Sequence, residues 1–168
     1  MEDAALLSQL DIATWASGHD GALADDLIAG LATSPWHNVA FWQKRIEDRS
    51  RPHWVWLIET PEPIGYVTFG GNTESDWPAY RGEIERLYLA QGWRGRGRGS
   101  LIWRKAADRL VEAGLVPFLT TVFAFNTAAQ GFYERQGGKR LGEQAAFEWR
   151  GEPVREYVYG FGDDVHAN

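Results

Sequence analysis

The stretch that decides the fold runs 82-GEIERLYLAQGWRGRGRGS-100. Its first part, residues 82–90, mixes apolar, β-branched and aromatic side chains in the pattern of a strand. Residues 94–99 then alternate arginine with glycine and predict a loop, and an amphipathic pattern from residue 98 to 113 predicts a helix. Glycines let a ligand approach the backbone N–H groups, and a helix N-terminus carries a partial positive charge. The stretch therefore predicts a binding site for a polyphosphate.

Two common phosphate-binding loops do not fit this stretch. A Walker loop needs Lys and then Ser or Thr after its last glycine, whereas Gly99 is followed by Ser100 and Leu101. A dinucleotide loop needs Gly-x-Gly-x-x-Gly, and the spacing here is Gly-x-Gly-x-Gly. A surface turn or a short nucleic-acid-binding segment has the same composition. The segment Arg94–Gly99 does fit Arg/Gln-x-x-Gly-x-Gly/Ala, and with Leu87-Tyr-Leu89 upstream it resembles the acetyl-CoA loop of the GNAT N-acetyltransferase superfamily.

A second motif points to the same family. Residues 118–125 read as a buried strand, Asn126 ends it, and residues 127–136 read as a helix stopped by Gly137 and Gly138. The superfamily shows this order of strand, Asn, a small-residue helix with Phe-Tyr-Glu, and Gly. The resemblance extends over about residues 53 to 160.

The pattern of the remaining chain predicts one domain over residues 1–168. The resemblance implies the fold class α/β (α+β), with a mixed central sheet that is splayed between the motif strand and the next strand and is flanked by helices. Further helices are expected at 3–16, 25–31 and 39–46, and further strands at 53–58, 64–69, 140–148 and 153–159. The family usually opens with a strand before an Asp-Ala like Asp3-Ala4. We expect that strand either to be absent here or to lie upstream.

Composition limits the classes of function. The net charge of −6 does not suit nucleic acid, and no stretch approaches transmembrane length, so neither nucleic acid nor a membrane is an expected partner. The chain has no cysteine, and its four histidines lack metal-ligand spacing, so we expect no metal and structural or solvated roles for the histidines. A cytoplasmic location is the default, and a homodimer is left open.

The resemblance assigns catalytic roles to three side chains. Glu83 and Glu85 share one strand face, and the family's base occupies one of these positions; Glu85 lies nearer the cofactor arm and is favoured. Either glutamate can instead be a solvated strand charge or a partner of a neighbouring arginine. The tyrosine of Phe-Tyr-Glu, Tyr133, corresponds to the acid that protonates the departing thiolate.

The resemblance also implies a binding site for acetyl-CoA as co-substrate. The strand end would line the pantetheine arm, the glycine loop and its arginines would hold the phosphates, and Asn126 would lie beside the arm or simply cap its helix. The residues expected at this site are Leu87, Tyr88, Leu89, Arg94, Gly95, Arg96, Gly97, Arg98, Gly99, Ser100, Asn126 and Tyr133.

These assignments imply an acetyl-CoA-dependent N-acetyltransferase. With no cysteine to carry the acetyl group, direct attack by a primary amine in a ternary complex is the simpler mechanism. The acidic chain favours a small cationic amine as acceptor. The alternatives are a non-catalytic acyl-CoA-binding sensor or interaction module, and an acetyltransferase that acts on protein N-termini or lysines.

Overall fold

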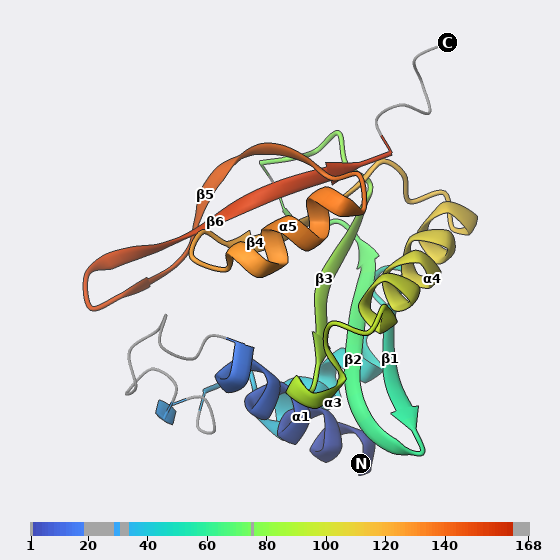
Figure 1. Ribbon diagram of the computed structural model, residues 1–168, viewed down its shortest axis with the longest axis vertical. Coiled ribbons are helices and arrows are strands. Elements are labelled where there is room, and N and C mark those ends of the chain that lie inside the picture. The colour runs from blue at the N-terminus through green and yellow to red at the C-terminus, as the bar shows by residue number, and fades with distance from the viewer. Residues whose placement is uncertain (1, 19–28, 31–33, 75, 163–168) are drawn as a thin grey trace. The chain divides into compact units, whose positions relative to one another are not determined.

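The computed structural model describes residues 2–18, 29–30, 34–74 and 76–162 (Figure 1). Its helices and strands run in the order α1 (Glu2–Gly18), α3 (Val39–Glu47), β1 (His53–Thr60), β2 (Glu62–Gly71), β3 (Gly82–Leu89), the 3-10 helix η2 (Gln91–Trp93), α4 (Arg98–Glu112), β4 (Phe118–Phe123), α5 (Thr127–Arg135), β5 (Lys139–Trp149) and β6 (Glu152–Phe161). The chain forms two compact units, residues 1–69 with 86–106 and residues 70–85 with 107–168.

The strands form one mixed sheet with the order β1-β2-β3-β4-β6-β5. β3 and β4 run parallel, and their register joins Gly82 to Phe118 and Glu83 to Leu119. β6 pairs antiparallel with both β4 and β5 over longer stretches. The short β3–β4 register agrees with a sheet that splays between these strands, and the predicted fold class is confirmed.

The first unit has a core between α1, α3 and the strands. Ala4, Leu7, Trp42 and Tyr66 form a buried apolar cluster, and α3 begins at an Asn38 side chain that accepts a hydrogen bond from the Phe41 N–H at 2.9 Å. Burial of such apolar side chains contributes roughly 1.5–3 kcal/mol each, so this cluster fixes both helices on the strands.

The second unit is built on the β5–β6 hairpin. Arg150 and Gly151 both have positive φ, 53° and 84°, as a tight two-residue hairpin turn requires. The Phe118 and Phe161 rings stack at 5.1 Å between centroids, and α5 lies alongside the hairpin in Figure 1. This turn joins the two strands that were expected at 140–148 and 153–159.

Most of the expected elements form within two or three residues of their predicted bounds, with one notable correction. The strand expected at 118–125 ends at Phe123, because the chain turns there and the Asn126 N–H donates to the Phe123 carbonyl at 2.9 Å. Asn126 leaves the extended conformation to cap α5, and the observed strand is therefore two residues shorter than expected. The helix expected at 25–31 lies mostly outside the described residues.

Candidate active site

The glycine loop in the first unit has the backbone expected of a ligand cradle. Gly95 and Gly97 have φ of 72° and 76°, values that L side chains rarely adopt. A Cβ built on either glycine would meet no heavy atom of the described residues within 4 Å. α4 begins at Arg98 directly after the loop, so the N–H groups of its first turn add to those of the glycines. The loop therefore fits an anionic group such as a phosphate.

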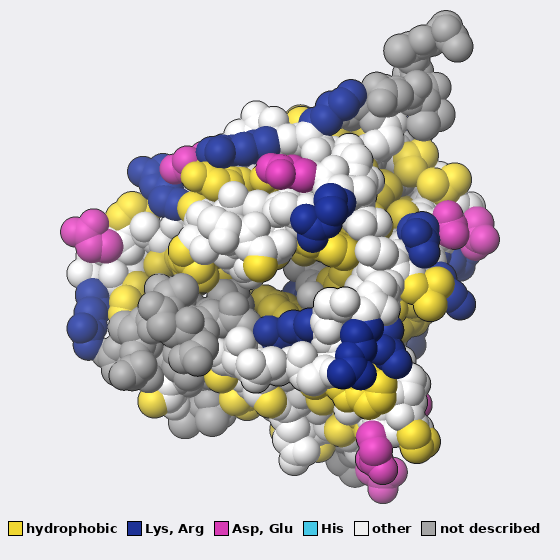
Figure 2. Space-filling model, viewed as in Figure 1, with side chains coloured by type: hydrophobic (Ala, Val, Ile, Leu, Met, Phe, Trp, Pro, Cys, Tyr) yellow, Lys and Arg dark blue, Asp and Glu magenta, His cyan; other side chains and the backbone are white. Residues whose placement is uncertain are grey.

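The arginines of the loop have different surroundings. Arg96 is exposed, and the guanidinium of Arg98 lies over the Trp93 ring, 4.6 Å from its centroid. Figure 2 shows basic side chains, in dark blue, gathered over the loop and the start of α4. Both side chains sit where they would complement the charge of a phosphate.

Arg94 is bound to the protein itself. Its Nε donates to the Leu89 carbonyl at 2.7 Å, and its Nη2 donates to the Ser17 hydroxyl at 3.0 Å. Weaker bonds reach the Ser17 and Thr14 carbonyls at 3.3 and 3.4 Å. Burial lowers the pKa of this guanidinium. Arg94 thus links the end of β3 to the last turn of α1, a contact that the phosphate-binding prediction did not include.

The end of β3 is closely packed on β2. Leu89 is buried, and Tyr88 packs on the Tyr66 ring at 5.7 Å between centroids. A Cβ at Gly65 would clash with the Tyr88 carbonyl, so glycine is required there for the strands to approach. The Ala90 N–H donates to the Ile64 carbonyl at 2.8 Å. Residues 87–89 are therefore a rigid strand end.

In the second unit the two candidate bases differ. Glu83 is only 4% exposed, and its Oε2 accepts hydrogen bonds from the Thr73 hydroxyl at 2.8 Å and the Thr73 N–H at 3.1 Å. Glu85 is half-buried on the same strand face. Glu83 thus anchors the segment after β2, and the role of Glu85 as base remains a prediction.

The candidate acid, Tyr133, is buried in α5. Its ring contacts Phe132 and Tyr159 with centroids 5.3 and 6.1 Å away. Burial raises the pKa of the Tyr133 phenol, and a hydrogen bond with Thr120 partly offsets this. The hydroxyl therefore keeps its proton at neutral pH, as a proton donor must.

Asn126 is the N-cap of α5. Its Oδ1 accepts a hydrogen bond from the Ala129 N–H at 3.1 Å. The capping role that the sequence offered as an alternative is therefore present. A place beside the cofactor arm remains a prediction.

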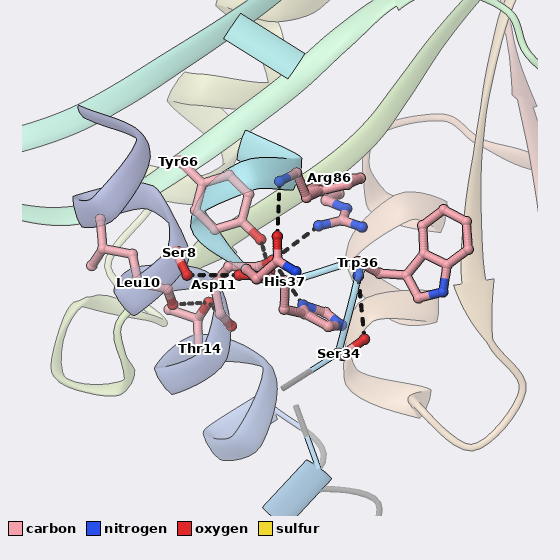
Figure 3. A network of polar contacts seen from close by, with 11 residues as sticks. Ser8, Leu10, Asp11, Thr14, Ser34, Trp36, His37, Tyr66 and Arg86 are labelled. Atoms are coloured by element: carbon pink, nitrogen blue, oxygen red, sulfur yellow. Dashed lines mark hydrogen bonds and ion pairs between the residues drawn. The ribbon is translucent and has the colours of Figure 1, made fainter. Parts of the chain in front are cut away.

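A buried polar cluster in the first unit was not predicted (Figure 3). The fully buried Asp11 carboxylate accepts hydrogen bonds from His37 Nδ1 at 2.8 Å, from Arg86 Nη1 at 3.0 Å and from the Tyr66 hydroxyl. The guanidinium of Arg86 also lies 5.0 Å from the centroid of the Phe41 ring. The four polar residues are far apart in the sequence and belong to no motif. The one available signal was the strand alternation, which turns Arg86 to the face opposite Glu85.

The expected site residues fall into two groups. The first unit holds the strand end and the glycine loop, residues 87–89 and 94–100, and the second unit holds Glu83, Glu85, Asn126 and Tyr133. In the part of the chain that the structure describes, no group of three His, Asp or Glu side chains is arranged to hold a metal ion. No described helix is both long and apolar enough to cross a membrane.

Comparison with known proteins places the chain among acetyltransferases. The model of the acetyltransferase (GNAT) family matches residues 22–138. A thialysine N-epsilon-acetyltransferase of Sus scrofa is 31% identical over 85 residues, which are 49% of this chain and 50% of the relative. The chain thus matches about half the length of this curated relative.

Solved structures share the fold at low sequence identity. The paiA N-acetyltransferase of Thermoplasma acidophilum, solved with coenzyme A, is 14% identical with a TM-score of 0.71, covering 95% of this chain and 92% of that one. Arabidopsis thaliana NAA60, solved with a bisubstrate analogue, is 17% identical with a TM-score of 0.59, covering 74% and 82%. These likenesses concern the fold alone.

Proposed function

Because this chain belongs to the GNAT family of acetyltransferases, we propose that it transfers an acetyl group from acetyl-CoA to a primary amine. The observation that carries the proposal is the glycine loop at 94–100. It lies inside the span matched by the family model, and Gly95 and Gly97 adopt the positive φ values that expose backbone N–H groups beside a helix start. A surface turn alone would not need this combination.

The residues of the loop would hold the co-substrate. The N–H groups of residues 95–100 face the phosphates in this proposal, with Arg96 and Arg98 as charged partners. Residues 87–89 would line the pantetheine arm, and Asn126 and Tyr133 are proposed as cofactor contacts on the family resemblance. When bound, acetyl-CoA supplies the acetyl thioester.

Three groups of the chain then move or stabilise charge. Glu85 removes a proton from the acceptor's ammonium, so that the neutral amine can attack the thioester carbonyl. The Leu89 N–H stabilises the carbonyl oxygen as it becomes negative. The new C–N bond forms, the C–S bond breaks, and Tyr133 gives its hydroxyl proton to the departing sulfur. The nitrogen of the new amide then loses its extra proton, and this proton restores the Tyr133 hydroxyl. Direct attack is favoured because the chain has no cysteine to carry the acetyl group.

The acceptor we propose is a small cationic amine. A relative named for thialysine acetylation and the chain's own net charge of −6 both support it. We further propose that residues 1–168 act as one cytoplasmic domain.

The test has two parts. Titration calorimetry with acetyl-CoA should show one binding site, and saturating acetyl-CoA should raise the melting temperature. Release of free CoA thiol is then followed with thialysine, lysine, spermidine and a panel of N-terminal peptides. Turnover with a small amine supports the proposal. Binding without turnover would indicate the acyl-CoA sensor, turnover only with peptides a protein acetyltransferase, and no binding would refute the proposal.

A further inference from the structure

A buried threonine of β4 lies where the pairing of β3 with β4 ends, inside the second unit. The register of these strands ends at Glu83 and Leu119, and the next residue on β4 is Thr120. Thr120 is only 1% exposed, and its hydroxyl donates a hydrogen bond to the Ile84 carbonyl of β3 at 2.7 Å. A side-chain hydrogen bond therefore joins the two strands just beyond their last paired residues.

The same hydroxyl also meets Tyr133 of α5. Thr120 lies opposite Tyr159 of β6, so these two side chains share one face of the sheet, and the centroid of the Tyr159 ring lies 6.1 Å from that of Tyr133. A hydrogen bond joins the side chains of Tyr133 and Thr120. The Tyr159 hydroxyl has an acceptor of its own, Glu134 Oε1 at 3.1 Å. Thr120 therefore lies directly against the hydroxyl that the proposed reaction uses.

The number of hydrogens fixes the direction of both bonds. A threonine hydroxyl has one hydrogen and a carbonyl oxygen can only accept, so the hydrogen of Thr120 points at Ile84. Towards Tyr133 the Thr120 oxygen then acts as an acceptor, and the hydrogen of the phenol points at it. The protein therefore orients the protonated Tyr133 hydroxyl by a chain of hydrogen bonds that runs from Tyr133 through Thr120 to Ile84.

The Thr120 hydroxyl can also serve Tyr133 after the proton has left. The Tyr133 oxygen is then negative and buried, and a buried charge without a hydrogen-bond donor is costly. Rotation about the Cβ–Oγ1 bond of Thr120 turns its hydrogen from Ile84 to the phenolate. A hydrogen bond to the charged form of a phenol lowers its pKa, and in Tyr133 the bond with Thr120 opposes the rise that burial causes.

We propose that Thr120 is a positioning residue for the proton transfer to sulfur, accepting the hydrogen of Tyr133 before the step and donating to the Tyr133 oxygen after it. Only hydrogen bonds change at Thr120, and the proton that reaches the sulfur comes from Tyr133. The inference rests on the proposed acetyl transfer with Tyr133 as the acid. It adds the group that orients this acid and stabilises its conjugate base.

The decisive variant is Thr120→Val, which has nearly the same shape but no hydroxyl. We expect kcat to fall about 10-fold, the effect of losing one hydrogen bond to a charged group, with the KM of the amine and the Kd of acetyl-CoA within about twofold of wild type. Thr120→Ser restores the hydroxyl and should return kcat to within about threefold of wild type. Thr68→Val exchanges another fully buried threonine, in β2, and is the matched control that should leave kcat unchanged.

A double-mutant cycle separates this role from a general effect on the sheet. If Thr120 acts through the Tyr133 hydroxyl, Thr120→Val should lower kcat little further in a Tyr133→Phe background. A shift of β3 against β4 would lower kcat by the same factor in both backgrounds, because it does not need the phenol. Urea denaturation identifies the conditions under which each variant is folded. If Thr120→Val does not fold, Thr120→Ala removes the same hydroxyl and takes its place in the cycle.

Three outcomes would overturn the inference. These are an unchanged kcat in Thr120→Val, full additivity with Tyr133→Phe, and a Thr120→Ser protein as slow as Thr120→Val. A wild-type kcat in Tyr133→Phe would overturn it as well, because there would be no acid to position. Failure of the proposed function looks different, because the wild-type protein itself would then acetylate none of the amines.

Discussion

The two glutamates of β3 illustrate how residues of one type on one strand face come to differ. Glu83 is buried and bonded to Thr73, whereas Glu85 is half-buried. We expect Glu85→Gln to lower kcat about 10²- to 10⁴-fold and to remove the acidic limb of the pH–rate profile. Glu83→Gln keeps an oxygen that accepts from Thr73, so kcat should stay within about threefold. Steady-state kinetics from pH 5 to 10 check both, and the reverse pattern would exchange the two roles.

Tyr133 allows a similarly narrow test. Tyr133→Phe keeps the buried ring and its contacts with Phe132 and Tyr159 but removes the hydroxyl. Loss of a single acid–base group should lower kcat by about 10- to 1000-fold and leave the Kd of acetyl-CoA within a few-fold. The measurement pairs turnover with calorimetry on the same preparation. An unchanged kcat would make Tyr133 a packing residue.

At the scale of elements, Arg94 ties the end of β3 to the end of α1. Lysine keeps the charge but not the planar fork that reaches Leu89 and Ser17 together. We therefore expect Arg94→Lys to lower the melting temperature by several degrees, almost as much as Arg94→Ala. Exposed Arg96 is the matched control. Arg96→Ala should weaken acetyl-CoA binding by about 1 kcal/mol without a change in melting temperature.

Two results in calorimetry and thermal melts would contradict this assignment. One is an Arg94→Lys protein as stable as wild type, which would mean that the fork is dispensable. The other is a loss of acetyl-CoA affinity without any loss of stability in Arg94→Ala. This result would mean that Arg94 binds the phosphates of acetyl-CoA, as the sequence predicted.

The start of α5 depends on one side chain. Asn126 Oδ1 accepts from the Ala129 N–H, and Asn126→Ala removes this cap. Loss of an N-cap costs about 1 kcal/mol of unfolding free energy. Urea denaturation measures it, and Asn126→Ser is the control, since serine also caps well. If alanine and serine are equally stable, the cap contributes nothing.

Across the whole molecule, stability should fall as the pH is lowered through the titration of His53. Burial and then the charges of Arg45 and Arg51 lower its pKa from 6.5 to about 4. Between these values the unfolded chain binds a proton that the folded chain does not, so stability is present above pH 6.5 and declines toward pH 4. Allowing for solvent screening, the loss from pH 7 to 5 should be about 1 kcal/mol. Urea denaturation measures this loss. Between pH 7 and 5 the unfolding free energy of His53→Gln should fall by about 1 kcal/mol less than that of the wild type.

The sequence predicted the helices, strands and turns better than the contacts between polar side chains. The loop glycines, the α5 cap and the β5–β6 turn could be predicted because each depends on the local backbone, as at Gly95, Asn126 and Gly151. The Asp11 cluster and the Arg94 link could not, because they join residues 26 to 80 positions apart. Hydrophobic periodicity places a strand or helix, but it does not say which polar side chains meet beneath it.

The burial of Asp11 also restricts which substitutions this sequence can accept during evolution. Replacing Arg86 alone leaves a buried carboxylate short of its cation, a change that typically costs 3–5 kcal/mol, while replacing both by apolar residues of similar volume can be neutral. Lineages that descend from such a chain should therefore exchange positions 11 and 86 together rather than one after the other. Position 37 should vary freely only in descendants that have already lost Asp11.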